Sequence, residues 1–323
     1  MSSKSRREFV QIALAALPGA AFLSSPHQLA AAGSKPNSKV AGVQIGMNVP
    51  YSFGPTPMTG DDILKNCVQL GLSAAELRIQ PVEVFLGAAP DLIYPPKKDK
   101  NAPKTDAAAS AAALREWRKS APLDRVKDFR TKWEDTGVLI EIVKVDSIMK
   151  MSDAEVDYAF AVAKALGGRA ISTELPLLGE KADEVNLKRI GQFADKHQIM
   201  VGYHGHGKTK PEHWEAAFAL AKFNGANVDL GHFVAGNNTS PVPFIKQHHD
   251  RVTHVHVKDR KFNNGPNTPF GEGDTPIVEV LHLIRDNKWN IQATIEFELK
   301  LSPGTDRMTE LARCIKFCRD ALA

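Results

Sequence analysis

Residues 252–259 read Val-Thr-His-Val-His-Val-Lys-Asp, a short run in which apolar and polar side chains alternate. A period of two in a β-branched segment is typical of a strand whose two faces meet different surroundings. Val255 and Val257 therefore share one face, while His254 and His256 point together to the other. Two imidazoles on one face of a strand predict a ligand site on that side of the sheet.

Similar β-rich runs alternate with helical patterns along the rest of the chain. Each run and its helical pattern occupy roughly 30–40 residues, which is typical of repeated βα units in a parallel sheet. Ser152, with Glu155 three residues later, has the spacing of a capping box at a helix start. Eight strands are expected, over Val40–Met47, Ala74–Ile79, Val138–Val145, Ala170–Leu175, Ile199–Gly205, Asn227–Phe233, Val252–Lys258 and Ile291–Leu299.

Eight βα units in about 290 residues match the usual size of a (β/α)₈ TIM barrel. An open doubly wound sheet is the alternative, but no Gly-x-Gly-x-x-Gly follows the first strand, where a dinucleotide-binding fold places its phosphate loop. The one long connection after a strand, residues 86–121, is expected over the mouth at the C-terminal ends of the strands. We therefore predict a single α/β barrel domain over residues 34–323.

The first 33 residues are expected to be an export signal and not part of the barrel. Arg6 and Arg7 precede the apolar run Ile12–Leu23, and small residues follow up to a cleavage point near Gly33. This order resembles a twin-arginine signal peptide. The apolar run is too short to span a bilayer, which takes about 20 residues. We expect residues 1–33 to be removed and the mature protein to be periplasmic, without a stable membrane anchor.

Charge and cysteine content exclude several classes of protein. The net charge is +4, and it falls to +2 without Lys4, Arg6, Arg7 and Glu8. A nearly neutral mature chain does not suggest a nucleic-acid partner. Three cysteines without a Cys-x-x-Cys pair indicate neither a disulfide framework nor a thiolate metal site.

Polar residues gather at the ends of the later strands. Between residue 34 and His197 the chain has no histidine, and ten follow from His197 to His282. Polar groups inside a barrel near the C-terminal ends of its strands indicate a site, because apolar side chains fill the interior below. Five consecutive strands supply them: Glu174; His204 and His206; Asp229 and His232; His254, His256 and Lys258; and Glu296 and Glu298.

A mixed set of oxygen and imidazole ligands without sulfur suits one divalent ion, either Mn²⁺, Mg²⁺, Co²⁺ or Zn²⁺. The remaining histidines fall on expected helices or loops, and we interpret them as surface or packing residues. They are His197, His213, His248, His249 and His282.

Four motifs follow one another in the later part of the chain. They are Asp-x-x-His at 229–232, His-Val-His-Val-Lys-Asp at 254–259, Gly-Glu-Gly-Asp at 271–274 and Ile-Glu-Phe-Glu at 295–298. Together they resemble a known family, the sugar phosphate isomerase/epimerase group of xylose isomerase-like barrels. The group includes ketose 3-epimerases, inosose dehydratases and endonuclease IV relatives. The likeness extends over the mature chain and is sharpest from Tyr203 to Glu298.

The resemblance implies that Asp229, His256 and Glu296 bind the metal and that His232 contacts the substrate. Ketose epimerases place a glutamate, both ligand and base, on the fifth strand, where this chain has His204. Glu174, one strand earlier, is the other candidate for the fourth ligand. Dehydratase-like members of the group do have a Tyr-His-x-His type of fifth strand, so both ligand sets stay open.

The chemistry expected of such a site is removal of a proton next to a carbonyl, because a divalent cation stabilises the resulting negative charge. Glu296 is the expected base, with His204 or His206 as the acid or base partner. The expected roles of Glu76, His254 and Lys258 are to position substrate hydroxyls.

The leading functional hypothesis is a metal-dependent isomerase or epimerase acting on an unphosphorylated sugar or keto-sugar, since phosphorylated sugars are mostly cytoplasmic. A dehydratase or a periplasmic 3-keto-glycoside lyase is the alternative, favoured by His204 in place of the second carboxylate. A non-catalytic sugar-binding barrel and an endonuclease IV-like nuclease are less favoured, the nuclease because the first four strands lack histidine. The sequence leaves open whether the protein forms a homo-oligomer.

Overall fold

The computed structural model describes residues 34–54, 57–94, 105–177 and 181–323. The expected signal peptide, residues 1–33, lies outside the described residues. Within them, no helix combines the length and the apolar character that a membrane span requires.

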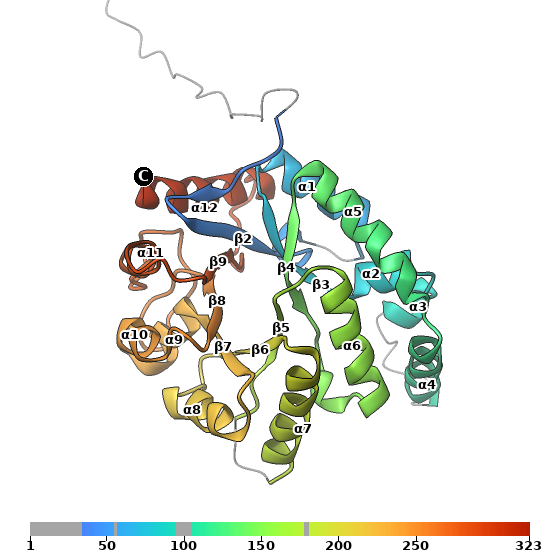
Figure 1. Cartoon of the computed structure of the whole chain (residues 1–323). Coiled ribbons are helices and arrows are strands. Elements are labelled where there is room, and N and C mark those ends of the chain that lie inside the picture. The colour runs from blue at the N-terminus through green and yellow to red at the C-terminus, as the bar shows by residue number, and fades with distance from the viewer. Residues whose placement is uncertain (1–33, 55–56, 95–104, 178–180) are drawn as a thin grey trace, which may run out of the picture.

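Eight parallel strands close into a barrel, which confirms the predicted (β/α)₈ fold (Figure 1). Neighbours in the chain are neighbours in the sheet, and the last strand pairs with the first in the register Ile45 with Ala293 and Met47 with Ile295. The strands are β2 (Val43–Val49), β3 (Ala74–Arg78), β4 (Leu139–Lys144), β5 (Ala170–Glu174), β6 (Met200–His204), β7 (Asn224–Asp229), β8 (Val252–Val257) and β9 (Gln292–Ile295).

Helices surround the barrel, and α12 lies beside β2, where the last unit meets the first (Figure 1). Buried Trp133 and Trp214 are among the large side chains in the layer between strands and helices. The helices are α1 (Gly60–Gln69), α2 (Gln80–Phe85), α3 (Pro90–Ile93), α4 (Thr105–Lys119), α5 (Val126–Thr136), α6 (Asp153–Ala165), α7 (Lys181–His197), α8 (Pro211–Leu220), α9 (Leu230–Asn237), α10 (Val242–His248), α11 (Ile277–Asp286) and α12 (Arg307–Leu322).

The start of α6 confirms the capping box read from the sequence. The Ser152 side chain caps the first turn, and the Glu155 carboxylate accepts from the Ser152 backbone N–H at 2.9 Å. These bonds satisfy backbone donors that have no partner within the helix.

The first expected strand is a hairpin in the structure. Lys39–Val40 forms a short antiparallel strand, β1, against β2. Ala41 and Gly42 form the turn between them, with φ of 46° and 87°. The parallel barrel therefore begins at Val43 and not at Val40.

Two strands end four residues earlier than the sequence indicated, and both corrections affect the site. The run Asn227–Phe233 is strand only to Asp229, because the Asp229 carboxylate accepts from the backbone N–H of His232 at 2.7 Å and caps α9. The strand expected over Ile291–Leu299 ends at Ile295. His232 therefore stands on a helix, and Glu296 on the segment just after the last strand.

The long connection over residues 86–121 contains helices α3 and α4 in its described part. α4 contacts α6 at the outside of the barrel, and Arg118 at its end donates to Glu83 at 2.7 Å and to Glu155 at 3.0 Å. These ion pairs are largely buried, so they fasten α4 to α2 and α6.

Candidate metal centre

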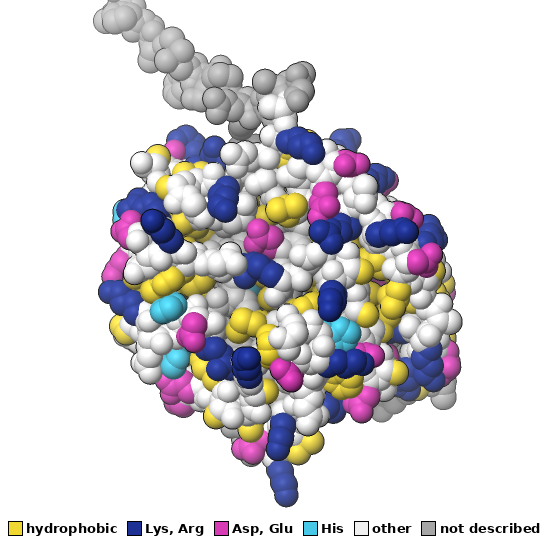
Figure 2. All heavy atoms as spheres, viewed as in Figure 1, with side chains coloured by type: hydrophobic (Ala, Val, Ile, Leu, Met, Phe, Trp, Pro, Cys, Tyr) yellow, Lys and Arg dark blue, Asp and Glu magenta, His cyan; other side chains and the backbone are white. Residues whose placement is uncertain are grey.

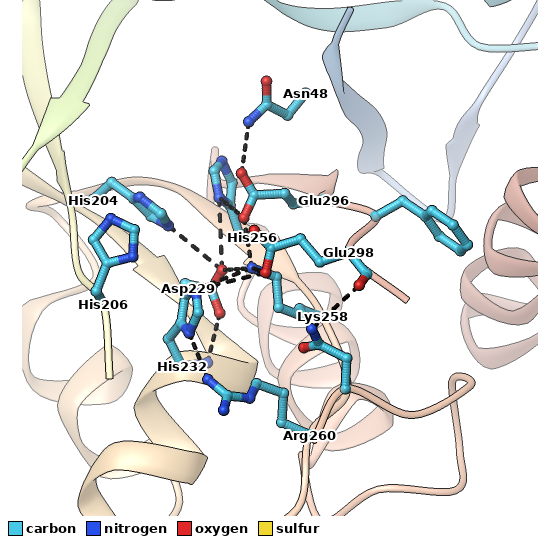
Figure 3. Close-up of polar contacts among 12 residues, drawn as sticks. Asn48, His204, His206, Asp229, His232, His256, Lys258, Arg260, Glu296 and Glu298 are labelled. Atoms are coloured by element: carbon cyan, nitrogen blue, oxygen red, sulfur yellow. Dashed lines mark hydrogen bonds and ion pairs between the residues drawn. The ribbon is translucent and has the colours of Figure 1, made fainter. Parts of the chain in front are cut away.

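Four side chains from consecutive strands converge at the C-terminal end of the barrel (Figure 3). They are His204 at the end of β6, Asp229 at the end of β7, His256 on β8 and Glu296 just after β9. One ligand atom from each lies within 4.8 Å of those from the others, and all four residues are buried. We call these four residues the metal cluster. Parallel strands end at one edge of the sheet, and that geometry brings together residues up to 92 positions apart in the sequence.

The imidazole of His256 is oriented by a buried carboxylate. Its Nε2 lies 2.6 Å from Oε2 of Glu76. Its Nδ1 has no hydrogen-bond partner among the described residues and lies 3.4 Å from Oε2 of Glu296 and 3.8 Å from Oδ2 of Asp229. A histidine that binds a metal through one nitrogen commonly donates the other N–H to a carboxylate. The buried Nδ1 of His256 therefore has the surroundings of a metal ligand.

His204 has the same arrangement as His256, with the roles of its two ring nitrogens exchanged. Its Nδ1 lies 3.1 Å from Oε2 of Glu174, and its Nε2 points to Oδ2 of Asp229 at 3.5 Å. Glu174 also contacts Nε2 of His206 at 2.5 Å and Nζ of Lys144 at 2.5 Å. His204 therefore lies in the metal cluster, and Glu174 contacts the far side of its ring. Glu174, His204 and His206 also form a second group of side chains that could hold an ion, so Glu174 stays a candidate ligand.

The two carboxylates of the metal cluster are surrounded by positive groups. Burial raises the pKa of Asp229, but His232 and Lys258 outweigh it and hold that pKa well below its usual range. Burial likewise opposes ionisation of Glu296, and His256 and Lys258 together hold its pKa far below the usual value. Two carboxylates and two oriented imidazoles fit a divalent cation in charge and in ligand type.

Lys258 lies among three carboxylates. Its Nζ is 2.7 Å from Glu296, 2.7 Å from Glu298 and 3.1 Å from Asp229. Burial lowers the pKa of this lysine, but the three carboxylates reverse that effect and raise it. Lys258 lies beside the expected reaction site, and its ammonium offsets the negative charge of Asp229 and Glu296.

Glu76 and His254 lie elsewhere than expected. Both side chains are fully buried, and Nε2 of His254 is 3.5 Å from the Glu76 oxygen that contacts His256. Nδ1 of His254 is 2.8 Å from the hydroxyl of Thr253. The structure therefore places both residues behind the His256 ring, in a supporting position, and not at the mouth where they would position substrate hydroxyls.

Changing Glu76 to glutamine tests this support. We expect the affinity for Mn²⁺ to fall about 10–100-fold, because the carboxylate that orients His256 is lost. A titration against a fluorescent chelator measures the affinity. Glu83→Gln is the matched control, since Glu83 is also fully buried but pairs with Arg118, away from the metal cluster. An unchanged affinity in Glu76→Gln would remove Glu76 from the site.

His206 and His232 flank the mouth. The His206 side chain is 56% exposed, and its ring centre lies 5.1 Å from that of His232. The hydrogen bond that the His206 ring donates to the Glu174 carboxylate raises the pKa of His206. Nδ1 of His232 lies 2.8 Å from Arg260, and its Nε2 lies 3.2 Å from Lys258. His232 therefore reaches from α9 to Lys258, beside the metal cluster.

Sequence reasoning missed several residues of the site. Asn48 donates to Oε1 of Glu296 at 2.8 Å, and the hydroxyl of Tyr51 donates to Oε1 of Glu298 at 2.7 Å. Asn227 lies 3.0 Å from Nε2 of His256. Asn48 and Asn227 are buried polar residues within β2 and β7, and a polar residue in a barrel strand was the signal that could have identified them.

The five histidines interpreted as surface or packing residues all lie away from the metal cluster. His197 contacts Asp157 at 2.6 Å, and His248 contacts Glu215 at 3.1 Å. His249 stacks on Trp289 with ring centres 4.4 Å apart. Nδ1 of His213 accepts from the backbone N–H of Lys210 at 3.1 Å, and Nε2 of His282 donates to the backbone carbonyl of Ala321 at 2.6 Å.

The fold is a parallel barrel, and its four converging side chains could hold a metal ion. Sequence comparison identifies the family. Residues 155–318 match the family described as xylose isomerase-like TIM barrel, which is about half of the chain, and the protein belongs to this family. No curated protein matches the sequence.

Solved structures share the fold at low sequence identity. The probable 3-DHS dehydratase AsbF of Bacillus anthracis is 14% identical with a TM-score of 0.58, over 85% of this chain and 98% of that one. A xylose isomerase domain protein of Planctomyces limnophilus is 12% identical with a TM-score of 0.59, over 87% and 97%. A D-allulose 3-epimerase of Methylomonas sp. is 10% identical with a TM-score of 0.57, over 89% and 99%. Enzymes of different reaction types thus share this barrel.

Proposed function

We propose that the protein is a divalent-metal-dependent enzyme that removes a proton from the carbon next to the carbonyl of an unphosphorylated sugar or keto-sugar. The observation that supports this most strongly is the metal cluster itself, in which a carboxylate stands behind each imidazole. A bound divalent cation would polarise the carbonyl and stabilise the negative charge that follows proton removal.

Glu296 is the base in this proposal. Asn48 donates to its Oε1 at 2.8 Å and Lys258 to its Oε2 at 2.7 Å, so its carboxylate is fixed in one orientation. A fixed, ionised carboxylate beside the reacting carbon can accept the proton. His206 is the acid or base partner, because it is half-exposed at the mouth whereas His204 lies buried between Glu174 and Asp229.

The cationic side chains at the mouth already contact other groups of the protein, which agrees with an unphosphorylated substrate. Within the described ranges, Lys144 pairs with Glu174, Arg78 with Asp146, and Lys258 with three carboxylates. Arg260 has no carboxylate partner there, but its guanidinium donates to the Gly265 carbonyl and contacts His232. A phosphate group is usually bound by cations or N–H groups that face it directly. The proposed periplasmic location, which rests on the residues before 34, points to the same class of substrate.

A second candidate reaction, β-elimination from a 3-keto-glycoside, is favoured by His204. Only Glu296 and Asp229 supply carboxylates to the metal cluster, so the paired glutamates of a ketose epimerase have no full counterpart. In elimination, Glu296 takes the proton from the carbon next to the carbonyl. The electron pair forms a C=C bond as the C–O bond to the leaving group breaks, and the leaving oxygen accepts a proton from His206. One base and one acid are sufficient for this step.

Incubation of the Mn²⁺-loaded protein in D₂O with free keto-sugars and 3-keto-glycosides tests the proposal. Deuterium on the carbon next to the carbonyl, without cleavage, would support isomerisation or epimerisation. Release of the alcohol would support elimination. No deuterium and no release from any substrate would contradict the proposal and favour a sugar-binding barrel without catalysis.

A nuclease is the least supported alternative. Lys and Arg side chains are interspersed with Asp and Glu over the face shown in Figure 2, whereas nucleic-acid binding proteins commonly carry a basic stripe. Incision of an abasic DNA duplex by the purified protein would contradict our proposal.

A further inference from the structure

A cavity of about 440 Å³ extends sideways from the metal cluster. At its inner end it is lined by Lys258, Glu296 and Glu298, and its outer wall is α12. The connection between β8 and α11 forms the remaining side. We call it the lateral cavity. Its volume lies in the range of small-molecule pockets, about 300–1,000 Å³.

The outer part of the lateral cavity is rich in apolar side chains. Phe270 and Phe317 meet edge to face with ring centres 5.8 Å apart. Phe297 is buried at the inner end. Pro269, Leu299 and Cys314 also line the walls. Aromatic side chains favour an apolar or aromatic occupant, because rings pack edge to face or offset at such distances.

The charged residues that α12 contributes to the walls are paired with one another. Arg313 pairs with Glu310, and Lys316 pairs with Asp320 at 2.5 Å. A charged ligand group would have to compete with these existing ion pairs. Glu272, which also lines the cavity, is exposed, so the buried part of the lining suits a neutral occupant.

One wall of the lateral cavity is fixed by Asp259, which also lines it. The Asp259 carboxylate accepts backbone N–H bonds from Gly271 at 2.8 Å, Gly273 at 3.0 Å and Thr275 at 3.2 Å. A Cβ atom at Gly273 would lie 1.9 Å from the same carboxylate, so this close approach requires glycine. The wall is held in shape without a ligand, and such preorganisation lowers the cost of binding.

We propose that the lateral cavity binds a neutral, apolar or aromatic aglycone of a keto-glycoside whose sugar ring lies at the metal cluster. Glu296 belongs to both regions, and Lys258, which lines the cavity, contacts it at 2.7 Å. A substituent on the reacting ring could therefore enter the cavity directly. This inference rests on the proposed function and adds the class of substrate: glycosides with a ring-bearing substituent rather than free monosaccharides.

The test compares 4-nitrophenyl 3-keto-glucoside with methyl 3-keto-glucoside on the Mn²⁺-loaded protein. We expect the aryl compound to have a KM at least about ten-fold lower, because its ring enters the lateral cavity. Cys314→Trp, which fills the cavity, and Phe317→Ala, which removes an aromatic wall, should each reduce that ratio to near one. Val278→Ala, at an exposed position of α11 outside the lining, should leave the ratio unchanged. Circular dichroism checks that each variant is folded.

Failure of this inference is distinct from failure of the proposed function. If both compounds turn over with equal KM, the lateral cavity does not bind the aglycone, while the proposed function stands. If neither compound turns over, calorimetry with unreactive 4-nitrophenyl glucoside and methyl glucoside still tests whether the lateral cavity binds the aglycone. Binding at least about ten-fold tighter for the aryl compound, lost in Cys314→Trp, supports the inference, and equal binding overturns it.

Discussion

Replacing Glu296 by glutamine is expected to slow proton exchange at the carbon next to the substrate carbonyl by about 10³-fold or more. Removal of a general base commonly costs 10²–10⁴-fold, and here the change also removes a negative charge from the metal cluster. Glutamine preserves the shape of the side chain but cannot accept the proton. The rate of deuterium incorporation in D₂O, followed by mass spectrometry, measures the effect.

Glu298→Gln is the matched control for this variant. Glu298 is two residues further along, contacts the same lysine at 2.7 Å and accepts from Tyr51, but it is not one of the four cluster residues. We expect its loss to be about ten-fold or less, because a hydrogen bond and not the base is weakened. Equal losses in the two variants would indicate that charge around Lys258, and not proton removal by Glu296, controls the rate.

Asp229→Asn is expected to lower the affinity for Mn²⁺ by at least about 100-fold, because a ligand charge disappears from a fully buried position. Asn also caps helices well, and its side-chain oxygen can still accept from the N–H of His232, which Asp229 caps at 2.7 Å. The barrel and α9 should therefore stay folded. Metal content after dialysis, measured by inductively coupled plasma mass spectrometry, gives the result.

Asp306→Asn makes the same change at another helix start. Asp306 caps α12 by accepting from the N–H of Thr309 at 2.8 Å, and it does not belong to the metal cluster. We expect this variant to retain its full metal content and nearly the same melting temperature. If Asp229→Asn also kept its metal, Asp229 would not be a ligand.

The barrel could be predicted from the sequence because the same pattern of strand and helix repeats along the chain. Each βα unit carries its own alternation, and Ser152 with Glu155 marks a helix start locally. Strand ends were less predictable. The segment after Asp229 continues with apolar residues, but it forms α9, and the backbone N–H of His232 donates to the Asp229 carboxylate at the start of that helix.

The sequence did not predict how deep in the barrel each side chain of the site lies. Alternation shows that His254 and His256 share a face, but not that His254 lies below with Glu76 while His256 faces the carboxylates. Whether His204 or Glu174 faces Asp229 likewise depends on how β5 and β6 lie side by side. Asn48 comes from the opposite end of the chain, and no local pattern links it to Glu296.

Diffraction from crystals soaked in Mn²⁺, with an anomalous difference map, tests the central claim most directly. We predict one strong peak about 2.0–2.3 Å from ligand atoms of His204, Asp229, His256 and Glu296. No peak among these four side chains at full soaking, or a peak held by other residues, would contradict the account.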